Sequence, residues 1–294
     1  MKEKIRIKFS DFWGGFNYDP TKYKVGDNTL FEILSERYDI EISDNPDFLI
    51  FSVFGNSHQR YNCTKIFYTG ENIRPNYETC DYSISFDYLD DERNFRFPLS
   101  AMILYENGIK NKFPKVIDIE DIKLEKTKFC NFVFSNPSAP LRNTLLSELS
   151  KYKKVDSGGR ALNNIGYFVD NKLNFLSEYK FTIAFENSEH NGYTTEKIVH
   201  PKLVNSIPLY YGNPLVSKDW NTKSFISLYD FDDIYDMIEY IKEMDNDDDL
   251  YHKMLQEPHF TNDTLPFDFQ TNNLLDFFDN IFKNKKQPCQ TFQI

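Results

Sequence analysis

Short apolar runs recur along the chain and predict buried β-strands. They cover residues 4–12, 47–53, 65–69, 81–86, 128–135, 181–185 and 207–211. Several are continuous rather than strictly alternating, which is typical of parallel strands that are buried on both faces of a sheet. Polar or glycine-containing turns bound the runs, as expected where a strand leaves its sheet.

Segments with helical periodicity separate these strands. Residues 28–38 place apolar side chains at helical spacing behind a candidate cap at Asn28. Similar amphipathic patterns mark residues 141–152, 234–244 and 274–282. Strands that alternate with amphipathic helices predict an α/β fold with parallel sheets.

The strands fall into two series, which suggests two α/β domains. Residues 106–128 lack clear periodicity and read as the connection between the series. We therefore expect a first domain at residues 1–125 and a second at 126–265. Residues 266–294 should form a C-terminal helix and tail that pack back on the first domain. The acidic run at residues 245–249 lacks a shaped set of metal ligands, so we expect a solvated loop there.

The most informative stretch is residues 179–214, where a strand, a polar loop, a helix and a second strand follow one another. Thr194 or Thr195 can cap the helix, and Glu196 and Lys197 fall in its first turn. The free N–H groups at a helix N-terminus suit a phosphate, and Lys197 adds a full charge. The carboxylate of Glu196 can accept hydrogen bonds from ribose hydroxyls. The alternative is an ordinary strand–helix unit with a solvated Glu-Lys pair.

Two further charged residues lie where a ligand could reach them. Arg142 falls in the first turn of its predicted helix, the end at which the helix dipole disfavours a cation. Its fork of donors suits a diphosphate, although a surface arginine fits the same pattern. Glu71 follows Gly70 at the carboxyl end of a predicted strand, the edge where α/β sheets bind ligands. It is the best general-base candidate of the first half, or else a loop carboxylate that caps the next turn.

Several separated blocks of the sequence resemble the α1,3/4-fucosyltransferases of glycosyltransferase family 10, and most of all the bacterial, Helicobacter-type members. The blocks are TGEN at residues 69–72, PLRN at residues 140–143, and FENS…GYTTEK…IPLYYGNP within residues 185–214. They occur in the same order as in the family and extend across most of the chain. The resemblance implies a GT-B fold, in which two Rossmann-like α/β domains face each other across a cleft.

The same resemblance implies roles for individual residues. It makes Glu71 the catalytic base and Arg142 a contact of the donor phosphate. Tyr167 would border the guanosine, although it could equally serve turn packing. An aromatic-glycine turn at residues 13–15 would lie on the acceptor side, where packing on the core is the alternative. The full set of donor-binding residues that it implies is Arg142, Tyr167, Asn187, Tyr193, Glu196 and Lys197.

The charge balance and the cysteines limit which ligands and which cellular compartment the protein is expected to have. The 294 residues carry a formal net charge of −11 without a basic block, so a nucleic-acid ligand is not expected. An anionic nucleotide-sugar would then need a local basic pocket. The four cysteines match no zinc or redox motif, and we expect isolated thiols. No signal peptide and no apolar run of transmembrane length is visible, so we expect a cytoplasmic protein, at most peripheral to the inner membrane.

Taken with the resemblance, these observations predict an inverting transferase. It would move L-fucose from GDP-β-L-fucose to the 3-hydroxyl of GlcNAc in a LacNAc-type (Galβ1,4GlcNAc) glycan, giving a Lewis x-type product. No cofactor would be obligatory, because two cations can replace a metal at the diphosphate, while a divalent metal could still stimulate turnover. Two alternatives stay open: a GT-B transferase that uses another sugar nucleotide, and a non-catalytic glycan-binding module.

Overall fold

The chain folds into two compact units. The computed structural model describes residues 2–13, 28–109, 113, 122 and 124–284. The first unit combines residues 1–110 with residues 267–294, and the second unit is residues 111–266. Within the described ranges, no helix is both long and apolar enough to cross a bilayer.

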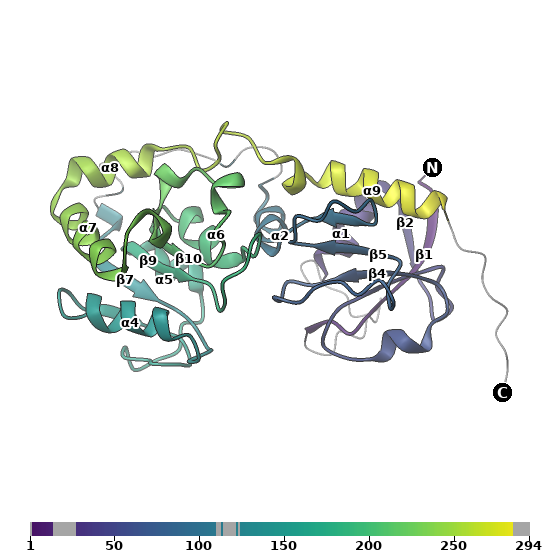
Figure 1. Ribbon diagram of the computed structural model, residues 1–294, viewed down its shortest axis with the longest axis horizontal. Helices are drawn as coiled ribbons and strands as arrows, with labels where there is room; N and C mark the ends of the chain where they lie inside the picture. The colour runs from purple at the N-terminus through teal and green to yellow at the C-terminus, as the bar shows by residue number, and fades with distance from the viewer. Residues whose placement is uncertain (1, 14–27, 110–112, 114–121, 123, 285–294) are drawn as a thin grey trace. The chain divides into compact units, whose positions relative to one another are not determined.

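A parallel sheet of six strands forms the centre of the first unit, in the order β2-β1-β3-β4-β5-β6 (Figure 1). The strands are β1 (Lys4–Ser10), β2 (Asp39–Ile42), β3 (Phe48–Phe51), β4 (Thr64–Tyr68), β5 (Tyr82–Ser85) and β6 (Asn94–Arg96). Each neighbouring pair runs parallel. All six strands therefore point their carboxyl ends to the same edge, where α/β proteins bind ligands.

The first strand ends earlier than the sequence predicts. Asp11 takes a left-handed conformation with φ of 59°, which a strand cannot continue. The Asp11 carboxylate accepts hydrogen bonds from the N–H groups of Ser57 at 2.9 Å and His58 at 2.8 Å. This carboxylate ties the loop after β1 to the loop after β3. The glycines of the predicted aromatic-glycine turn lie outside the described residues, but Trp13 is described and is exposed.

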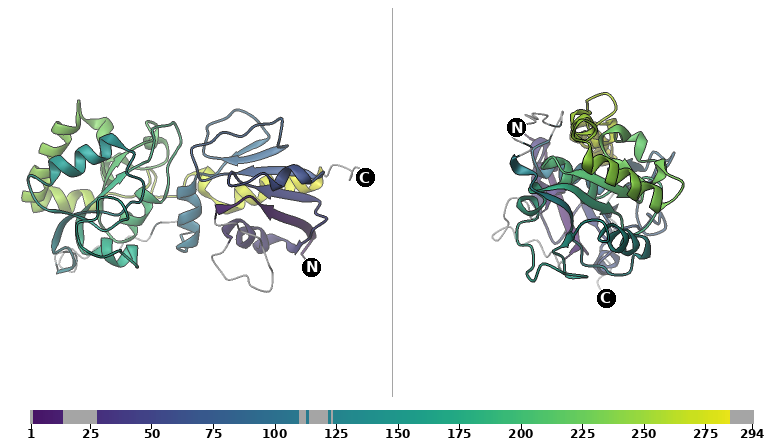
Figure 2. Two further views of the ribbon diagram at one scale, coloured as in Figure 1. Left: turned by 90° about the horizontal axis from the view of Figure 1, so that it is seen from below. Right: turned by 90° about the vertical axis from the view of Figure 1, so that its left-hand side faces the viewer.

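Three α-helices lie within the described residues of the first unit. They are α1 (Thr29–Arg37), α2 (Leu99–Glu106) and α9 (Thr271–Lys283). The predicted cap of α1 is confirmed, because the Asn28 side chain accepts a hydrogen bond from the Phe31 N–H at 3.0 Å. The ring of Phe282, on α9, lies 4.6 Å from that of Phe48 and 5.0 Å from that of Tyr38, between centroids. Figures 1 and 2 show α9, in yellow, along one face of this sheet.

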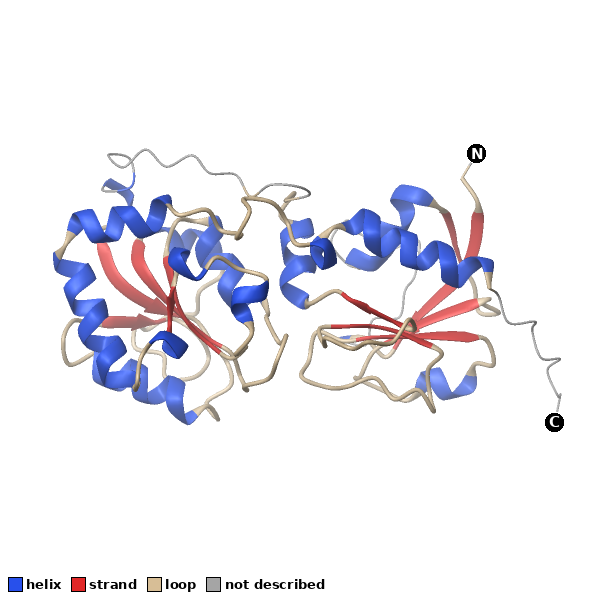
Figure 3. Cartoon of the chain, turned by 45° about the horizontal axis from the view of Figure 1, so that its top comes forward, coloured by secondary structure: helices blue, strands red, loops and turns tan. Residues whose placement is uncertain are grey.

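The second unit is built on a parallel sheet of five strands, in the order β11-β10-β9-β7-β8, with helices on both faces (Figure 3). Its strands are β7 (Lys128–Phe132), β8 (Val155–Ser157), β9 (Tyr179–Phe185), β10 (Ile207–Tyr211) and β11 (Ile226–Ser227). Its helices are α4 (Pro140–Leu149), α5 (Lys172–Ser177), α6 (Glu196–Leu203), α7 (Ile234–Asn246) and α8 (Asp248–Gln256). The strand β9, buried from Phe181 to Phe185, occupies the middle of this sheet, as its apolar run predicts.

The prediction of a solvated loop at residues 245–249 is right for the exposure of residues 246–249 but wrong for Asp245 and for the loop, because α7 and α8 meet there. The side chain of Asp245 is only 3% exposed and pairs with Lys180 at 3.3 Å and with Lys153. The next acidic residue, Asp247, caps α8 by accepting a hydrogen bond from the Leu250 N–H at 3.0 Å. The sequence of an acidic run does not show whether its carboxylates are solvated, form ion pairs or cap a helix.

Candidate active site

The loop after β9 and the start of α6 form the frame of the candidate site. Thr195, one of two predicted caps, is the N-cap of α6, and its hydroxyl accepts from the Lys197 N–H. Glu186, which the sequence analysis missed, accepts hydrogen bonds from the Thr195 N–H at 2.8 Å and from its hydroxyl. Glu186 is buried, so it fixes where α6 begins. Its place after a predicted strand and within the FENS block could have pointed to it.

The helix start holds an ion-pair system in which Glu186 is buried and Lys197 and Glu196 are partly buried. The Lys197 ammonium lies 3.0 Å from a Glu186 oxygen and 3.3 Å from a Glu196 oxygen. Burial opposes the charge on Glu196, but Lys197 and Lys172 prevail and lower its pKa to about 2. Against burial, the two carboxylates raise the pKa of Lys197. Glu196 is therefore ionised at neutral pH and can accept hydrogen bonds from sugar hydroxyls. The alternative of a solvated Glu-Lys pair is wrong.

Arg142, in the first turn of α4, is a buried cation and not a surface arginine. Its guanidinium donates to the Asn187 side-chain oxygen at 3.0 Å and to main-chain carbonyls of Phe185 and Asn136. The ring of Phe134 lies 4.6 Å away. Burial lowers the pKa of Arg142. Asn187 thus orients Arg142, and the structure brings both to the carboxyl end of β9.

A third cation, Lys172, lies near Arg142 and Lys197, and the sequence patterns did not indicate it. Together with Lys172, at the start of α5, they line one small cavity of about 20 Å³. We call these three residues the cation cluster. The sequence carries no signal for Lys172, because it lies outside the family blocks.

The two predicted tyrosines occupy different places. Tyr193 is buried in the loop between β9 and α6, where its N–H donates to the His190 carbonyl at 3.1 Å. Tyr167 is 58% exposed, and its phenol interacts electrostatically with Lys128 and Tyr179, the first residues of β7 and β9. The structure does not bring Tyr167 to the cation cluster, and its contact with guanosine stays a prediction.

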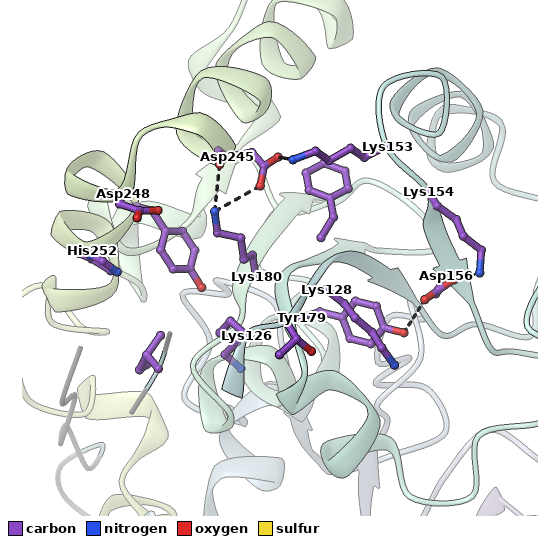
Figure 4. Close-up of a pocket in the computed structure, with 14 residues that line it drawn as sticks. Lys126, Lys128, Lys153, Lys154, Asp156, Tyr179, Lys180, Asp245, Asp248 and His252 are labelled. Atoms are coloured by element: carbon purple, nitrogen blue, oxygen red, sulfur yellow. Dashed lines mark hydrogen bonds and ion pairs between the residues drawn. The ribbon is translucent and has the colours of Figure 1, made fainter. Parts of the chain in front are cut away.

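A larger lysine-lined pocket, of about 630 Å³, opens near the amino ends of β7, β8 and β9 (Figure 4). Its lysines are Lys126, Lys128, Lys153, Lys154 and Lys180. Carboxylates of Glu178, Asp156 and Asp245 pair with four of them. The ammonium of Lys126 donates to main-chain carbonyls where α5 and α6 end. Since each lysine already has a partner, this pocket suits a diphosphate less well than the cation cluster does.

Glu71 lies in the first unit, just beyond the carboxyl end of β4. Its carboxylate is exposed, while its N–H donates to the Thr69 hydroxyl at 2.9 Å. Nearby, the Arg74 guanidinium donates to the Asn72 side chain at 2.9 Å and pairs with Asp87 at the same distance. This clamp holds the turn that carries Glu71 to the end of β5, and it leaves the Glu71 carboxylate open to solvent.

Comparison with known families and structures identifies the architecture. The N-terminal domain model of alpha-(1,3)-fucosyltransferase FucT matches residues 7–105, and the C-terminal model of glycosyltransferase family 10 (fucosyltransferase) matches residues 123–272. A crystal structure of an alpha1,3-fucosyltransferase with GDP-fucose superposes with a TM-score of 0.81 at 30% identity, covering 99% of this chain and 94% of that one. A structure of Anabaena HepE with UDP-glucose, at 10% identity and a TM-score of 0.51, shares the fold alone. The predicted α/β fold of the GT-B type is confirmed.

Curated relatives agree with these matches. The chain is 35% identical to the alpha-(1,3)-fucosyltransferase FucT of Helicobacter pylori, over 95% of this chain and 66% of the relative. It is 35% identical to alpha-(1,3)-fucosyltransferase B of Drosophila melanogaster, over 39% of this chain and 29% of that protein. The chain thus spans just under two thirds of the length of the first relative, and its match covers less than a third of the second. It belongs to glycosyltransferase family 10, the fucosyltransferases.

Proposed function

We propose that the protein transfers L-fucose from GDP-β-L-fucose to a glycan acceptor. The observation that carries this proposal is the cation cluster at the carboxyl end of β9, in a member of a fucosyltransferase family. Cations withdrawn from water attract a diphosphate strongly, because the surrounding dielectric is low. A solved relative at 30% identity was crystallised with GDP-fucose, which supports the same donor.

The second unit binds the donor in this proposal. Arg142 and Lys197 contact the diphosphate, and the ionised Glu196 accepts hydrogen bonds from the ribose. As the bond to the sugar breaks, negative charge develops on the phosphate oxygen. Fixed cations therefore stabilise the transition state more than they stabilise the bound substrate. Because Asn187 and Glu186 already hold these cations, little reorganisation is needed during the reaction.

Glu71 acts as the general base. It takes the proton from the acceptor hydroxyl while that oxygen forms a bond to C1 of fucose. The bond from C1 to the phosphate oxygen breaks, and GDP leaves with the electron pair. The sugar passes through an oxocarbenium-like state, as in glycoside hydrolysis. A single displacement inverts the anomeric centre, so a β-linked donor gives an α-linked product.

The acceptor is the 3-hydroxyl of GlcNAc in a Galβ1,4GlcNAc-type glycan, and the product is of Lewis x type. An aromatic pair in the first unit supports a sugar-binding surface there. The rings of Trp13 and Phe54 meet edge to face at 5.0 Å, and they are 77% and 42% exposed. They follow β1 and β3, which end at the same edge of the sheet as β4, the strand before Glu71.

Calorimetric titration with GDP, GDP-fucose, UDP and UDP-galactose tests this proposal against its two alternatives. We expect GDP and GDP-fucose to bind and the uridine nucleotides to bind far more weakly. Preference for a uridine nucleotide would indicate a transferase with another donor. Binding of a free glycan without any nucleotide would indicate a glycan-binding module, which has no need for buried cations.

A further inference from the structure

Lys172 is a cation that lacks a partner among the described residues, next to the ion pairs that Lys197 makes with Glu186 and Glu196. It is the first residue of α5, and its ammonium makes no hydrogen bond or ion pair within the part of the chain that the structure describes. Burial lowers the pKa of Lys172, while Glu196 and Glu186 raise it. Those two carboxylates lie in direct contact with Lys197 instead. A half-buried lysine in this situation is costly to keep charged.

Two other groups beside Lys172 also lack partners. The Nε atom of Arg142 and the Nδ1 atom of His200 are buried without a hydrogen bond to any described residue. Arg142 lines the same cavity as Lys172, and His200 interacts electrostatically with Lys172 and Lys197. Native proteins satisfy nearly all their buried polar groups, so unsatisfied groups that gather at one place indicate a missing ligand or water.

The charges identify the kind of ligand. The cation cluster supplies three positive charges, whereas Glu186 and Glu196 supply two negative ones. One positive charge is therefore uncompensated, on the side of α5, before any ligand binds. The cavity of about 20 Å³ has room for one water molecule but not for a phosphate. A phosphate would therefore have to bind outside the cavity that these cations line.

We propose that Lys172 is a third donor-binding cation, which contacts the diphosphate of the nucleotide together with Arg142 and Lys197. This inference rests on the proposed function, since it assigns a further residue to the same donor site. Lys172 adds to the binding of the diphosphate and not to that of the nucleoside. During transfer it helps to stabilise the charge on departing GDP, but it exchanges no proton with the reacting atoms.

The test compares GDP with guanosine by calorimetry in four proteins. These are the wild type, Lys172→Met, Lys172→Arg and the control Lys223→Met, which removes an exposed lysine of the same unit. We expect Lys172→Met to raise the Kd for GDP roughly 10- to 100-fold, the usual range for a lost charged hydrogen bond. The Kd for guanosine should stay near the wild-type value. Lys172→Arg should keep most of the GDP affinity, and Lys223→Met all of it.

A second measurement detects the proton on Lys172. At alkaline pH the wild type should take up protons when it binds GDP, because the phosphate restores the charge that burial disfavours. Titrations in buffers with different ionisation enthalpies measure this uptake, which should shrink in Lys172→Met. A loss of affinity that is equal for GDP and guanosine, or an unchanged GDP affinity, would overturn the inference alone. A wild type that binds no GDP at all would overturn the proposed function as well.

Discussion

Glu71 is the residue whose proposed role depends most on chemistry and least on packing, since its carboxylate is exposed. Glu71→Gln keeps the shape of the side chain but cannot accept a proton. We expect kcat to fall by about 10²- to 10⁴-fold, the usual contribution of a general base. GDP affinity should stay near the wild-type value, because the donor contacts belong to other residues. Stopped assays of fucose transfer and calorimetry with GDP measure the two quantities.

Glu78→Gln is a matched control, because Glu78 is another exposed carboxylate of the first unit. It should leave kcat unchanged. If Glu71 merely organised its own turn, Glu71→Gln would lower the melting temperature and leave kcat close to normal. That outcome would move the role of base to another carboxylate of the first unit.

His200 gives a prediction about stability and pH. Burial lowers its pKa from 6.5 to about 4, and Lys172 adds to this effect. Between these values the unfolded chain binds the proton more tightly than the folded protein does. The contribution of His200 is therefore complete above about pH 6.5 and is lost as the pH falls towards 4.

Urea unfolding of the wild type and of His200→Gln, at a series of pH values, checks this. The free energy of unfolding should fall less steeply with acidification in His200→Gln than in the wild type. Parallel curves for the two proteins would show that His200 is not held neutral by the fold.

For single residues, the sequence indicated which charged side chains are candidates for the site, but not how deeply they are buried or what they contact. The sequence proposes Arg142, Glu196 and Lys197 as charged site residues, because their types and positions at helix starts carry a physical meaning. The same pattern could not show that Arg142 is fully buried, or that Glu186 holds the cap of α6. Those facts depend on which strands and helices pack together, and a single sequence does not contain that information locally.

The unit from β9 to β10 depends on a glycine. Gly212 has φ of +146°, and a Cβ there would lie 2.4 Å from the Cβ of Glu186. Gly212→Ala should therefore combine backbone strain with a steric clash, and we expect a loss of about 2–5 kcal/mol in unfolding free energy. GDP affinity should fall too, because Glu186 would move away from Lys197. Chemical denaturation and calorimetry measure both effects.

Gly166→Ala is the matched control for this prediction. Gly166 also has positive φ, +82°, but a Cβ there meets nothing within 4 Å. It should cost only the strain of a left-handed residue, about 1–2 kcal/mol. Equal losses in the two variants would mean that contact with Glu186 does not constrain residue 212.

At the scale of elements, long buried strands were predictable and short ones were not. The apolar run that leads into the FENS block predicted β9 correctly, because a strand that is buried on both faces needs apolar residues at nearly every position. β8 and β11, at the two edges of the same sheet, have only three and two residues. Such short segments acquire strand structure by pairing with a neighbour, as Val155 does with Cys130, and leave no periodicity to detect. The six residues of α5 were missed for the same reason, and Lys172 with them.

At the scale of the whole molecule, a net charge of −11 contrasts with a local site that gathers three cations. If these cations stabilise the departing GDP, transfer needs no divalent metal. We expect fucose transfer to continue in excess EDTA, with added manganese giving at most a moderate stimulation. Rate measurements across a series of metal concentrations check this. Complete loss of turnover in EDTA, restored by manganese, would contradict the role given to the cation cluster.

The chain returns from the second unit to the first at its C-terminal end, and local sequence pattern does not reveal such a return. Two series of apolar runs sufficed to predict two parallel sheets, because strands buried on both faces appear in the sequence as nearly continuous apolar runs. The grouping of residues 267–294 with the first unit depends on contacts far apart in sequence, such as Tyr38 with Phe282. The sequence analysis expects residues 266–294 to pack on the first domain, but amphipathic periodicity shows only that α9 has an apolar face and not which surface that face covers.

The most direct test of the central claim is the linkage of the product formed from GDP-fucose and a Galβ1,4GlcNAc acceptor, determined by NMR. We expect GDP release in equal amount to a product with fucose α-linked to the 3-hydroxyl of GlcNAc. UDP-galactose should give no product with the same acceptor. A product formed only from a uridine nucleotide, a β-linked fucose, or no transfer at all would show that the protein is not an α1,3-fucosyltransferase of this kind.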